Sequence, residues 1–408
     1  MTYNGKAFIK PLPFALGGQD HFLRQGTSTV SLSVAQSIGM KWFRNDCPWN
    51  ITQGGSTPIE GLPGVYSSTN IAAIASVAVS VKSYGMSPLF VVTVNQSPGI
   101  CGTLSTALTN SNVYTSITIT AQPFAISIGD TITLTNTTQA HTQNIVSQSN
   151  LAANTAGTIN VTSFTANYSY GIGTWIYDTV WVACTPQHFA TMMAYLVAQS
   201  GLQGLDWELF NEPDGGNWSI SATMLYQCYA LAYPAMKTAD PTCTIHALQL
   251  SSNGGGGVTY YNSFVALGGL NYCDVIDIHQ YWINYSGPQA PAQTYAFTNP
   301  ANLNYFQQMG EFQAARIVAG DNKPLWLTEW GYPCVGNGIM TNQLQAQWIQ
   351  DTMAGFLGMD TINNVPYSSY LKVAIIYTML QDSDYPIIQT PSTPYKAVAC
   401  LRELIAGN

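Results

Sequence analysis

The chain has 408 residues, of which 46% are hydrophobic and 8% are charged, with 12 basic against 20 acidic side chains. This length exceeds the ~250 residues typical of one α/β barrel, so it leaves room for a barrel and a small additional module. The sequence contains no cluster of Lys and Arg, which argues against nucleic-acid binding. A polar but largely neutral surface suits a neutral, hydroxyl-rich ligand, and it equally suits adaptation to an unusual milieu.

Targeting signals and cysteine motifs are both missing from the sequence. The amino-terminal stretch lacks the apolar segment of a secretory signal, and no run of 18 uncharged apolar residues marks a transmembrane helix. We therefore expect no membrane insertion, and a protein that is cytoplasmic or is released by lysis or particle assembly. The eight cysteines are scattered singly, without Cys-x-x-Cys spacing, so we expect no metal site, while disulfides and buried thiols both remain open.

Most of the sequence alternates short β-rich runs with amphipathic helical runs, a pattern typical of parallel βαβ units. In chain order, the predicted strands are 14–18, 41–45, 88–95, 205–211, 244–250, 275–279, 325–328 and 373–379. The clearest predicted helices are 29–38, 69–84, 186–200, 219–238 and 395–405. Eight strands with intervening helices predict a closed (β/α)8 TIM barrel, formed by residues 1–100 and 178–408.

Residues 101–177, here called the β-module, break this pattern. Ile, Val and Thr alternate with polar residues between Gly- and Asn-rich turns, and Asp130 is the single charged residue of the segment. This period of two predicts a small antiparallel β-module inserted after the third barrel strand. Such an insertion leaves the barrel at its C-terminal face, where barrel active sites lie. A wall of the substrate cleft, a surface that itself binds glycan, an inert insertion and a partner-docking surface are alternative roles for it.

The scarce glutamates point to the chemistry. The six are at positions 60, 208, 212, 311, 329 and 403, and three of them fall in the strand-like runs Trp-Glu-Leu-Phe-Asn-Glu-Pro (207–213) and Leu-Thr-Glu-Trp-Gly-Tyr (327–332). Hydrolysis of a glycosidic bond needs two carboxyl groups, one to protonate the leaving oxygen and one to attack or to activate water. Glu212 and Glu329 fall at predicted strand ends on one barrel face, as this chemistry requires.

These two runs resemble the strand-four and strand-seven signatures of glycoside hydrolases of clan A, and the wording is closest to families 39 and 5. The similarity extends to residues 39–44, 277–281 and 393–397, and it covers most of the chain except the β-module. The resemblance implies a retaining glycosidase that acts on a poly- or oligosaccharide without a metal or cofactor. It makes Glu212 the general acid/base and Glu329 the nucleophile, with carboxyl groups ~5–5.5 Å apart.

The same resemblance assigns roles to residues around the carboxylates. Asn211 would hydrogen-bond the sugar 2-hydroxyl, and Arg44 would keep Glu329 ionised. His279 and Tyr281 would orient the two carboxylates.

Aromatic residues near strand ends are candidates for stacking on the sugar, and we select Trp282 and Trp330. Strand eight of the clan often carries a Trp that forms the floor of the sugar subsite next to the scissile bond. This sequence has none there, and Tyr377 is the expected replacement. The departure leaves the shape of that subsite, and so the identity of the sugar, open.

Each assignment has a non-catalytic alternative. Glu212 could be a carboxylate at a helix N-terminus, and Glu329 a structural ion-pair partner. Arg44 could lie at the surface, and His279 could be a core histidine. Glu208 is out of phase with Asn211 along its strand, so it either faces away from the sugar or lies deeper in the barrel, and it is the reserve candidate for Glu212.

Three functions follow from these alternatives. The first is an O-glycosidase. The β-module resembles small Thr-rich repeats of phage tail and baseplate proteins, so the enzyme could be mounted on a phage tail or virion to degrade a host surface glycan. The second is a non-catalytic carbohydrate-binding or virion structural protein on a glycosidase-like barrel. The third is a transglycosylase, which would use the same residues. In each case carbohydrate is the expected ligand, and other tail proteins are candidate partners.

Overall fold

A computed structural model gives the structure of the chain. It describes residues 2–3, 6–7, 12–25, 27–48, 59–62, 65–93, 100–121, 126–135, 141–152, 155–178, 186–215, 220–251, 255–281, 283–284, 287–288, 305–332, 342–357, 369–380, 386–390, 393–394 and 396–406. Within these ranges, no helix is both long enough and apolar enough to cross a membrane.

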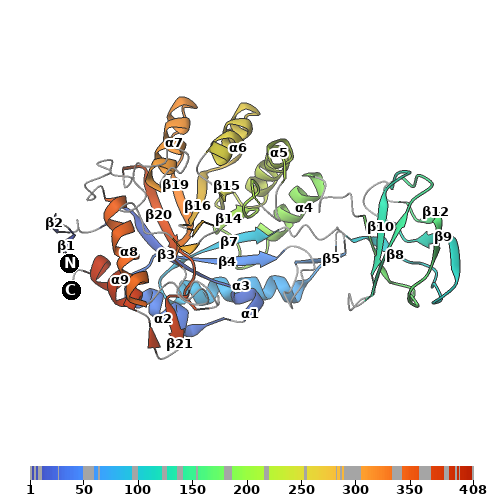
Figure 1. The fold of residues 1–408 in the computed structure, drawn as a ribbon, viewed down its shortest axis with the longest axis horizontal. Coiled ribbons are helices and arrows are strands. Elements are labelled where there is room, and N and C mark those ends of the chain that lie inside the picture. The colour runs from blue at the N-terminus through green and yellow to red at the C-terminus, as the bar shows by residue number, and fades with distance from the viewer. Residues whose placement is uncertain are drawn as a thin grey trace.

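Eight parallel strands close into a barrel, which confirms the predicted fold class (Figure 1). Each strand pairs with the strands before and after it in the barrel, and the last strand pairs with the first. The strands are β3 (Ala15–Asp20), β4 (Trp42–Pro48), β7 (Ser87–Thr93), β14 (Asp206–Leu209), β15 (Thr244–Leu250), β16 (Val275–Tyr281), β19 (Leu325–Gly331) and β20 (Leu371–Ile376). The predicted strands match these within a few residues at each end.

Helices surround the barrel and connect successive strands (Figure 1). Several begin at serine N-caps: the side chains of Ser28, Ser67 and Ser221 each accept a hydrogen bond from a backbone N–H of the first turn. The helix at 29–38 ends at Gly39, which adopts φ +90° and so stops the helix in a left-handed conformation. The principal helices are α2 (Thr29–Ile38), α3 (Ser68–Ser83), α4 (Pro186–Val197), α5 (Ala222–Ala239), α6 (Gly255–Ala266), α7 (Tyr305–Val318), α8 (Asn342–Phe356) and α9 (Lys396–Ala406).

The barrel interior has an apolar layer and a charged layer. Side chains near the starts of several strands form an apolar cluster inside the barrel, made up of Leu89, Val275, Trp326, Val373 and Ile375 with Ala15 and Trp42 beside them. Neighbouring strand residues of opposite phase pack outward against the helices in a much larger cluster. Buried charged residues occupy the inside of the barrel beyond the apolar layer, and they lead to the strand ends where the predicted site lies.

Antiparallel strands follow β7 in the chain, as the period-two pattern predicts. One sheet has the strand order β11 (Thr142–Val146), β10 (Thr131–Thr135), β13 (Trp175–Asp178), β8 (Ile100–Thr103), and a second pairs β12 (Gly157–Thr165) with β9 (Val113–Ile119). The segment has its own buried apolar cluster, including Ile132, Leu134 and Ile159. It lies at one end of the long axis of the molecule, away from the two chain termini (Figure 1).

Five of the cysteines are buried free thiols. They are Cys47, Cys228, Cys243, Cys273 and Cys400. For these five, the structure therefore favours the buried-thiol alternative over disulfides.

Candidate active site

A β-bulge in β19 points Glu329 into the barrel. Ile278 of β16 lies opposite Leu327, but the next residue, His279, lies opposite Glu329, so Thr328 is an extra residue. Because Trp326 faces the interior, regular alternation would place Glu329 on the outside. The bulge shifts the phase by one residue and brings the carboxylate inside.

Glu212 lies just beyond the end of β14, in a strained turn. Phe210 has φ +99° and Glu212 has φ +48°, and neither is a glycine. Non-glycine residues in such conformations cost of order 1–3 kcal/mol each and are concentrated at functional sites. The backbone N–H of Glu212 donates to the carbonyl oxygen of Gln249 on β15 at 3.1 Å, and this contact joins the turn to the neighbouring strand.

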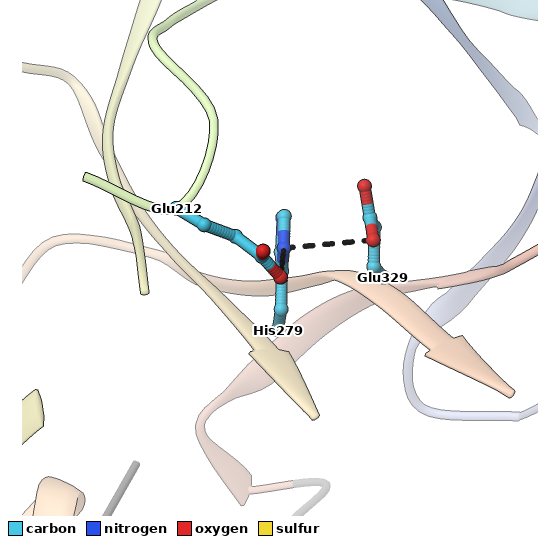
Figure 2. A group of neighbouring side chains, drawn as sticks. All are labelled: Glu212, His279 and Glu329. Carbon is cyan, nitrogen blue, oxygen red and sulfur yellow. Dashed lines mark hydrogen bonds and ion pairs between the residues drawn. The ribbon is translucent and has the colours of Figure 1, made fainter. Parts of the chain in front are cut away.

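The His279 ring lies between the two carboxylates (Figure 2). Its Nδ1 is 3.1 Å from Glu212 Oε1 and 3.6 Å from Glu329 Oε2. One ligand atom from each of the three residues lies within 4.8 Å of those of the other two, so an oxygen of Glu212 and an oxygen of Glu329 are no further apart than this. His279 is fully buried. His279 is therefore buried, as the core-histidine alternative predicts, and it also contacts both candidate carboxylates.

Arg44 connects the polar residues of the site. Its Nε donates to Glu208 Oε2 at 2.6 Å, and its two terminal nitrogens donate to Gln19 Oε1 at 2.7 Å and Asn211 Oδ1 at 2.8 Å. It also donates to Glu329 Oε1. The side chain is fully buried, so the surface alternative for Arg44 is wrong. A guanidinium with this many fixed acceptors holds all of them in place.

Glu329 receives donors on both oxygens. The Tyr281 hydroxyl donates to Oε2 at 2.5 Å, while Arg44 donates to Oε1. Burial raises the pKa of the Glu329 carboxyl, but the charges of His279 and Arg44 and the hydrogen bonds from Tyr281 and Arg44 outweigh it and leave the pKa below its usual value. Glu329 is therefore held as a carboxylate.

His279 and Glu208 have raised pKa values for different reasons. Burial lowers the pKa of His279, but the Glu329 charge and the hydrogen bond to Glu212 raise it above the ordinary value. Burial raises the pKa of Glu208 to about 7 against the effect of Arg44, and the negative Asp277 adds to the rise. Glu208 lies deeper in the barrel than the strand end, which was one of its two predicted positions, and contacts the site through Arg44.

Tyr377 belongs to a small polar group beside Glu329. Its hydroxyl lies 3.1 Å from Nε2 of His21, and Nδ1 of His21 lies 2.6 Å from Asp46 Oδ2. The rings of Tyr377 and Tyr281 make an edge contact with centroids 6.0 Å apart. The sequence reasoning missed His21 and Asp46. The available signal was their position, since each follows one of the first two predicted strands by at most three residues.

The two tryptophans selected for sugar stacking have different outcomes. Trp330 is fully buried and packs edge-on against Phe356 of α8, with ring centroids 5.8 Å apart. The bulge that turns Glu329 inward turns the next residue outward, so Trp330 packs between barrel and helix and the stacking prediction for it is wrong. Trp282 lies outside the described residues.

Glu212, His279 and Glu329 are also close enough to hold a metal ion. However, Arg44 and Tyr281 already donate to the two oxygens of Glu329, and a guanidinium at a carboxylate disfavours a second cation there. The donors around Glu329 instead suit an anion that must stay ionised. The arrangement can therefore supply a nucleophilic carboxylate next to a second, partly exposed carboxyl group.

Known structures share this fold at low sequence identity. A family 39 glycoside hydrolase from Bacteroides cellulosilyticus WH2 aligns with a TM-score of 0.57 at 14% identity over 98% of this chain and 65% of its own. A GH5-4 broad-specificity endoglucanase from Clostridium acetobutylicum aligns with a TM-score of 0.52 at 10% identity, over 96% of each chain. A triple variant of an endo-β-1,4-glucanase from Xanthomonas axonopodis pv. citri gives 0.55 at 10% identity, over 97% of this chain and all of the other.

These similarities concern the fold. The protein spans 65% of the length of the family 39 structure. Neither protein-family models nor curated protein sequences match the chain. The comparisons support the fold alone, an eight-stranded parallel barrel similar to the folds of the family 39 and GH5-4 structures.

Proposed function

We propose that this protein is a retaining O-glycosidase that hydrolyses a poly- or oligosaccharide through a covalent glycosyl-enzyme intermediate. The observation that carries the proposal is the spacing of Glu212 and Glu329, which have oxygens within 4.8 Å of each other. A retaining pair needs carboxyl groups ~5–5.5 Å apart, whereas an inverting pair needs ~6.5–9.5 Å to hold a water molecule against the sugar. The short spacing supports direct attack by one carboxylate.

In the first step, a Glu329 oxygen attacks the anomeric carbon and the bond from that carbon to the glycosidic oxygen breaks. Glu212 gives its proton to the departing oxygen, which leaves as an alcohol. Arg44 and Tyr281 keep Glu329 anionic before attack. His279 contacts Oε1 of Glu212, which leaves Oε2 to carry the proton.

In the second step, the Glu212 carboxylate takes a proton from water while the water oxygen attacks the anomeric carbon. The ester bond to Glu329 breaks, so the sugar is released with its original configuration and both carboxyl groups return to their starting states. Both steps need only the chain's own residues and water.

The neighbouring polar residues would bind the sugar. Asn211 is oriented by Arg44 next to Glu212, where it would hydrogen-bond the sugar 2-hydroxyl. Tyr377 would take the place of the clan's tryptophan beside Glu329, with its hydroxyl fixed by His21. Trp282 stays a candidate for stacking.

The proposed substrate class, a poly- or oligosaccharide, is supported by the names of two similar structures, which are endoglucanases. We propose that the β-module, which contains a single charged residue, forms a wall of the substrate cleft. The proposed boundaries are 101–177 for the β-module and 1–100 with 178–408 for the barrel. Mounting on a phage tail or virion stays a prediction.

The proposal is tested by the configuration of the first product. A panel of aryl glycosides is incubated with the enzyme, and the anomer released first is identified by proton NMR before mutarotation. We expect retention of configuration, with no turnover by Glu329→Gln. Inversion would contradict the proposed chemistry. Binding of oligosaccharides without hydrolysis of any panel member would favour the non-catalytic alternative.

A further inference from the structure

A second strained turn lies next to the one that carries Glu212. Leu248 and Gln249, in β15, have φ +87° and +39°, and both are fully buried. The carbonyl oxygen of Gln249 accepts the hydrogen bond from Glu212 N–H. The N–H of Ser251 donates to Asp214 Oδ1 at 2.7 Å and makes a second link between the same two chain segments. The backbone of Glu212 therefore depends on the conformation of Gln249.

The side chain of Gln249 is anchored in the barrel interior. Its Nε2 donates to Asp277 Oδ2 at 3.2 Å. Nδ1 of His246 lies 3.0 Å from the same oxygen, and its Nε2 lies 3.1 Å from Asp206 Oδ1. Burial lowers the pKa of His246, but Asp277 and Asp206 raise it to about 10, so the ring donates from both nitrogens at neutral pH. Asp277 is thus held between two donors.

We propose that Gln249, anchored by the ion triad Asp206–His246–Asp277, is a positioning residue for Glu212. The triad fixes the Gln249 side chain, the side chain fixes the left-handed turn, and the turn presents the carbonyl oxygen that holds the Glu212 backbone. A proton donor works only from within hydrogen-bond reach of the oxygen it protonates. The inference rests on the proposed role of Glu212 as acid/base.

His279 contacts both carboxylates, but the hydrogen bonds to the two oxygens of Glu329 come from Arg44 and Tyr281. A change at Gln249 therefore displaces the acid and leaves the nucleophile in place. This separation gives the inference a signature that general loss of stability does not produce. Protonation matters when the leaving group is a poor one, and it matters little when the leaving group departs readily as an anion.

The test is Gln249→Met, which keeps the side-chain volume but removes the amide. Its kcat/KM, which reports glycosylation, is measured on a phenyl and a 2,4-dinitrophenyl glycoside of one sugar that the wild type hydrolyses. We expect a loss of about tenfold or more on the phenyl glycoside, a fraction of the ~10²–10⁴ that a general acid supplies. On the dinitrophenyl glycoside we expect a rate near that of the wild type. Asp277→Asn, which weakens the anchor with less change of shape, should show the same selectivity to a smaller degree.

Gln345→Met is the matched control. Gln345 is also fully buried, and its Nε2 donates to the carbonyl oxygens of Tyr332 and Pro386 at 2.9 and 3.2 Å. The same chemical change is made there at a buried glutamine whose amide bonds do not involve Glu212. We expect its effect on the two substrates to be equal, whatever its effect on the melting temperature.

Glu212→Ala separates failure of the inference from failure of the proposed function. If Glu212→Ala loses activity selectively on the phenyl glycoside while Gln249→Met loses equally on both substrates, or on neither, the positioning role of Gln249 is wrong. If Glu212→Ala itself shows no selectivity, the acid/base assignment fails, and with it the residue that Gln249 is proposed to position.

Discussion

The barrel interior contains several buried charged side chains, whereas the β-module contains almost no charged residues. The interior contains Arg44, Glu208, His246 and Asp277, all fully buried, together with the two candidate catalytic carboxylates. The β-module, residues 101–177, contains a single charged residue, Asp130. It is held together by an apolar cluster and by backbone pairing.

This difference is informative because buried charge is costly. An ion in the interior loses its hydration, and replacing a buried ion pair by apolar side chains is often neutral or stabilising. A chain that is only 8% charged nevertheless places several of its charges there. The β-module folds without doing so. We infer that the interior charges are retained for the chemistry of the site, and the following predictions test that contrast.

The largest effect, on both stability and the pH dependence of activity, is expected at Arg44. Arg44→Met leaves Glu208 and Glu329 buried without their guanidinium partner, which should destabilise the fold by about 3–5 kcal/mol. The positive charge also lowers the pKa of Glu329, so its removal raises that pKa. Because the carboxylate is the active form in the proposed mechanism, the acidic limb of the kcat/KM profile should move to higher pH. Urea unfolding and a pH–rate profile measure the two effects.

Arg402→Met provides the control for Arg44. Arg402 is exposed and donates to Ser37 Oγ at 2.6 Å. Its replacement should change stability by less than about 0.5 kcal/mol and leave the pH profile unchanged. Equal effects at the two arginines would contradict the contrast between interior and surface.

A smaller, pH-dependent effect is expected at His246. Its pKa rises from 6.5 to about 10 on folding, because Asp277 and Asp206 outweigh the effect of burial. A raised folded-state pKa contributes stability that is fully present below pH 6.5 and is lost as the pH rises towards 10. The wild type should therefore lose more stability over this window than His246→Gln, as measured by urea unfolding at several pH values. Parallel pH dependence in the two proteins would mean that the ring is neutral in the folded state.

The smallest effect is expected at Asp130 in the β-module. Its Oδ2 accepts a hydrogen bond from Ser127 N–H at 2.6 Å within a turn. Asp130→Asn should cost about 1 kcal/mol or less and leave kcat/KM unchanged, as followed by thermal unfolding and aryl glycoside assays. A loss comparable to that at Arg44 would show that the β-module also depends on charge.

Much of the fold could be predicted because its signals are local. Alternation of β-rich and helical runs gave the eight strands, and the glutamates at 212 and 329 stood out beside their motif residues. The β-bulge at Thr328 could not be predicted, because it depends on the register between β16 and β19. Trp330 was selected as an aromatic residue near a strand end, and the bulge turns it away from the site.

The hydrogen-bond and ion-pair partners of the buried charged residues could not be predicted from the sequence either. Asp206, His246 and Asp277 lie on three different strands, and their contacts exist only once the register of the barrel is set. The same is true of His21 and Asp46 beside Tyr377. The alternation of strand residues left two positions open for Glu208, and only the closed barrel selects the deeper one.

The most direct test of the central claim is covalent labelling by 2-deoxy-2-fluoroglycosides. The protein is incubated with 2,4-dinitrophenyl 2-deoxy-2-fluoroglycosides of several sugars, and any adduct is detected by intact mass and located by peptide mapping. We predict one fluoroglycosyl group per chain, on Glu329, and none on Glu329→Gln. An adduct on Glu212 or Glu208, or turnover of the parent glycoside without any adduct on Glu329, would contradict the account.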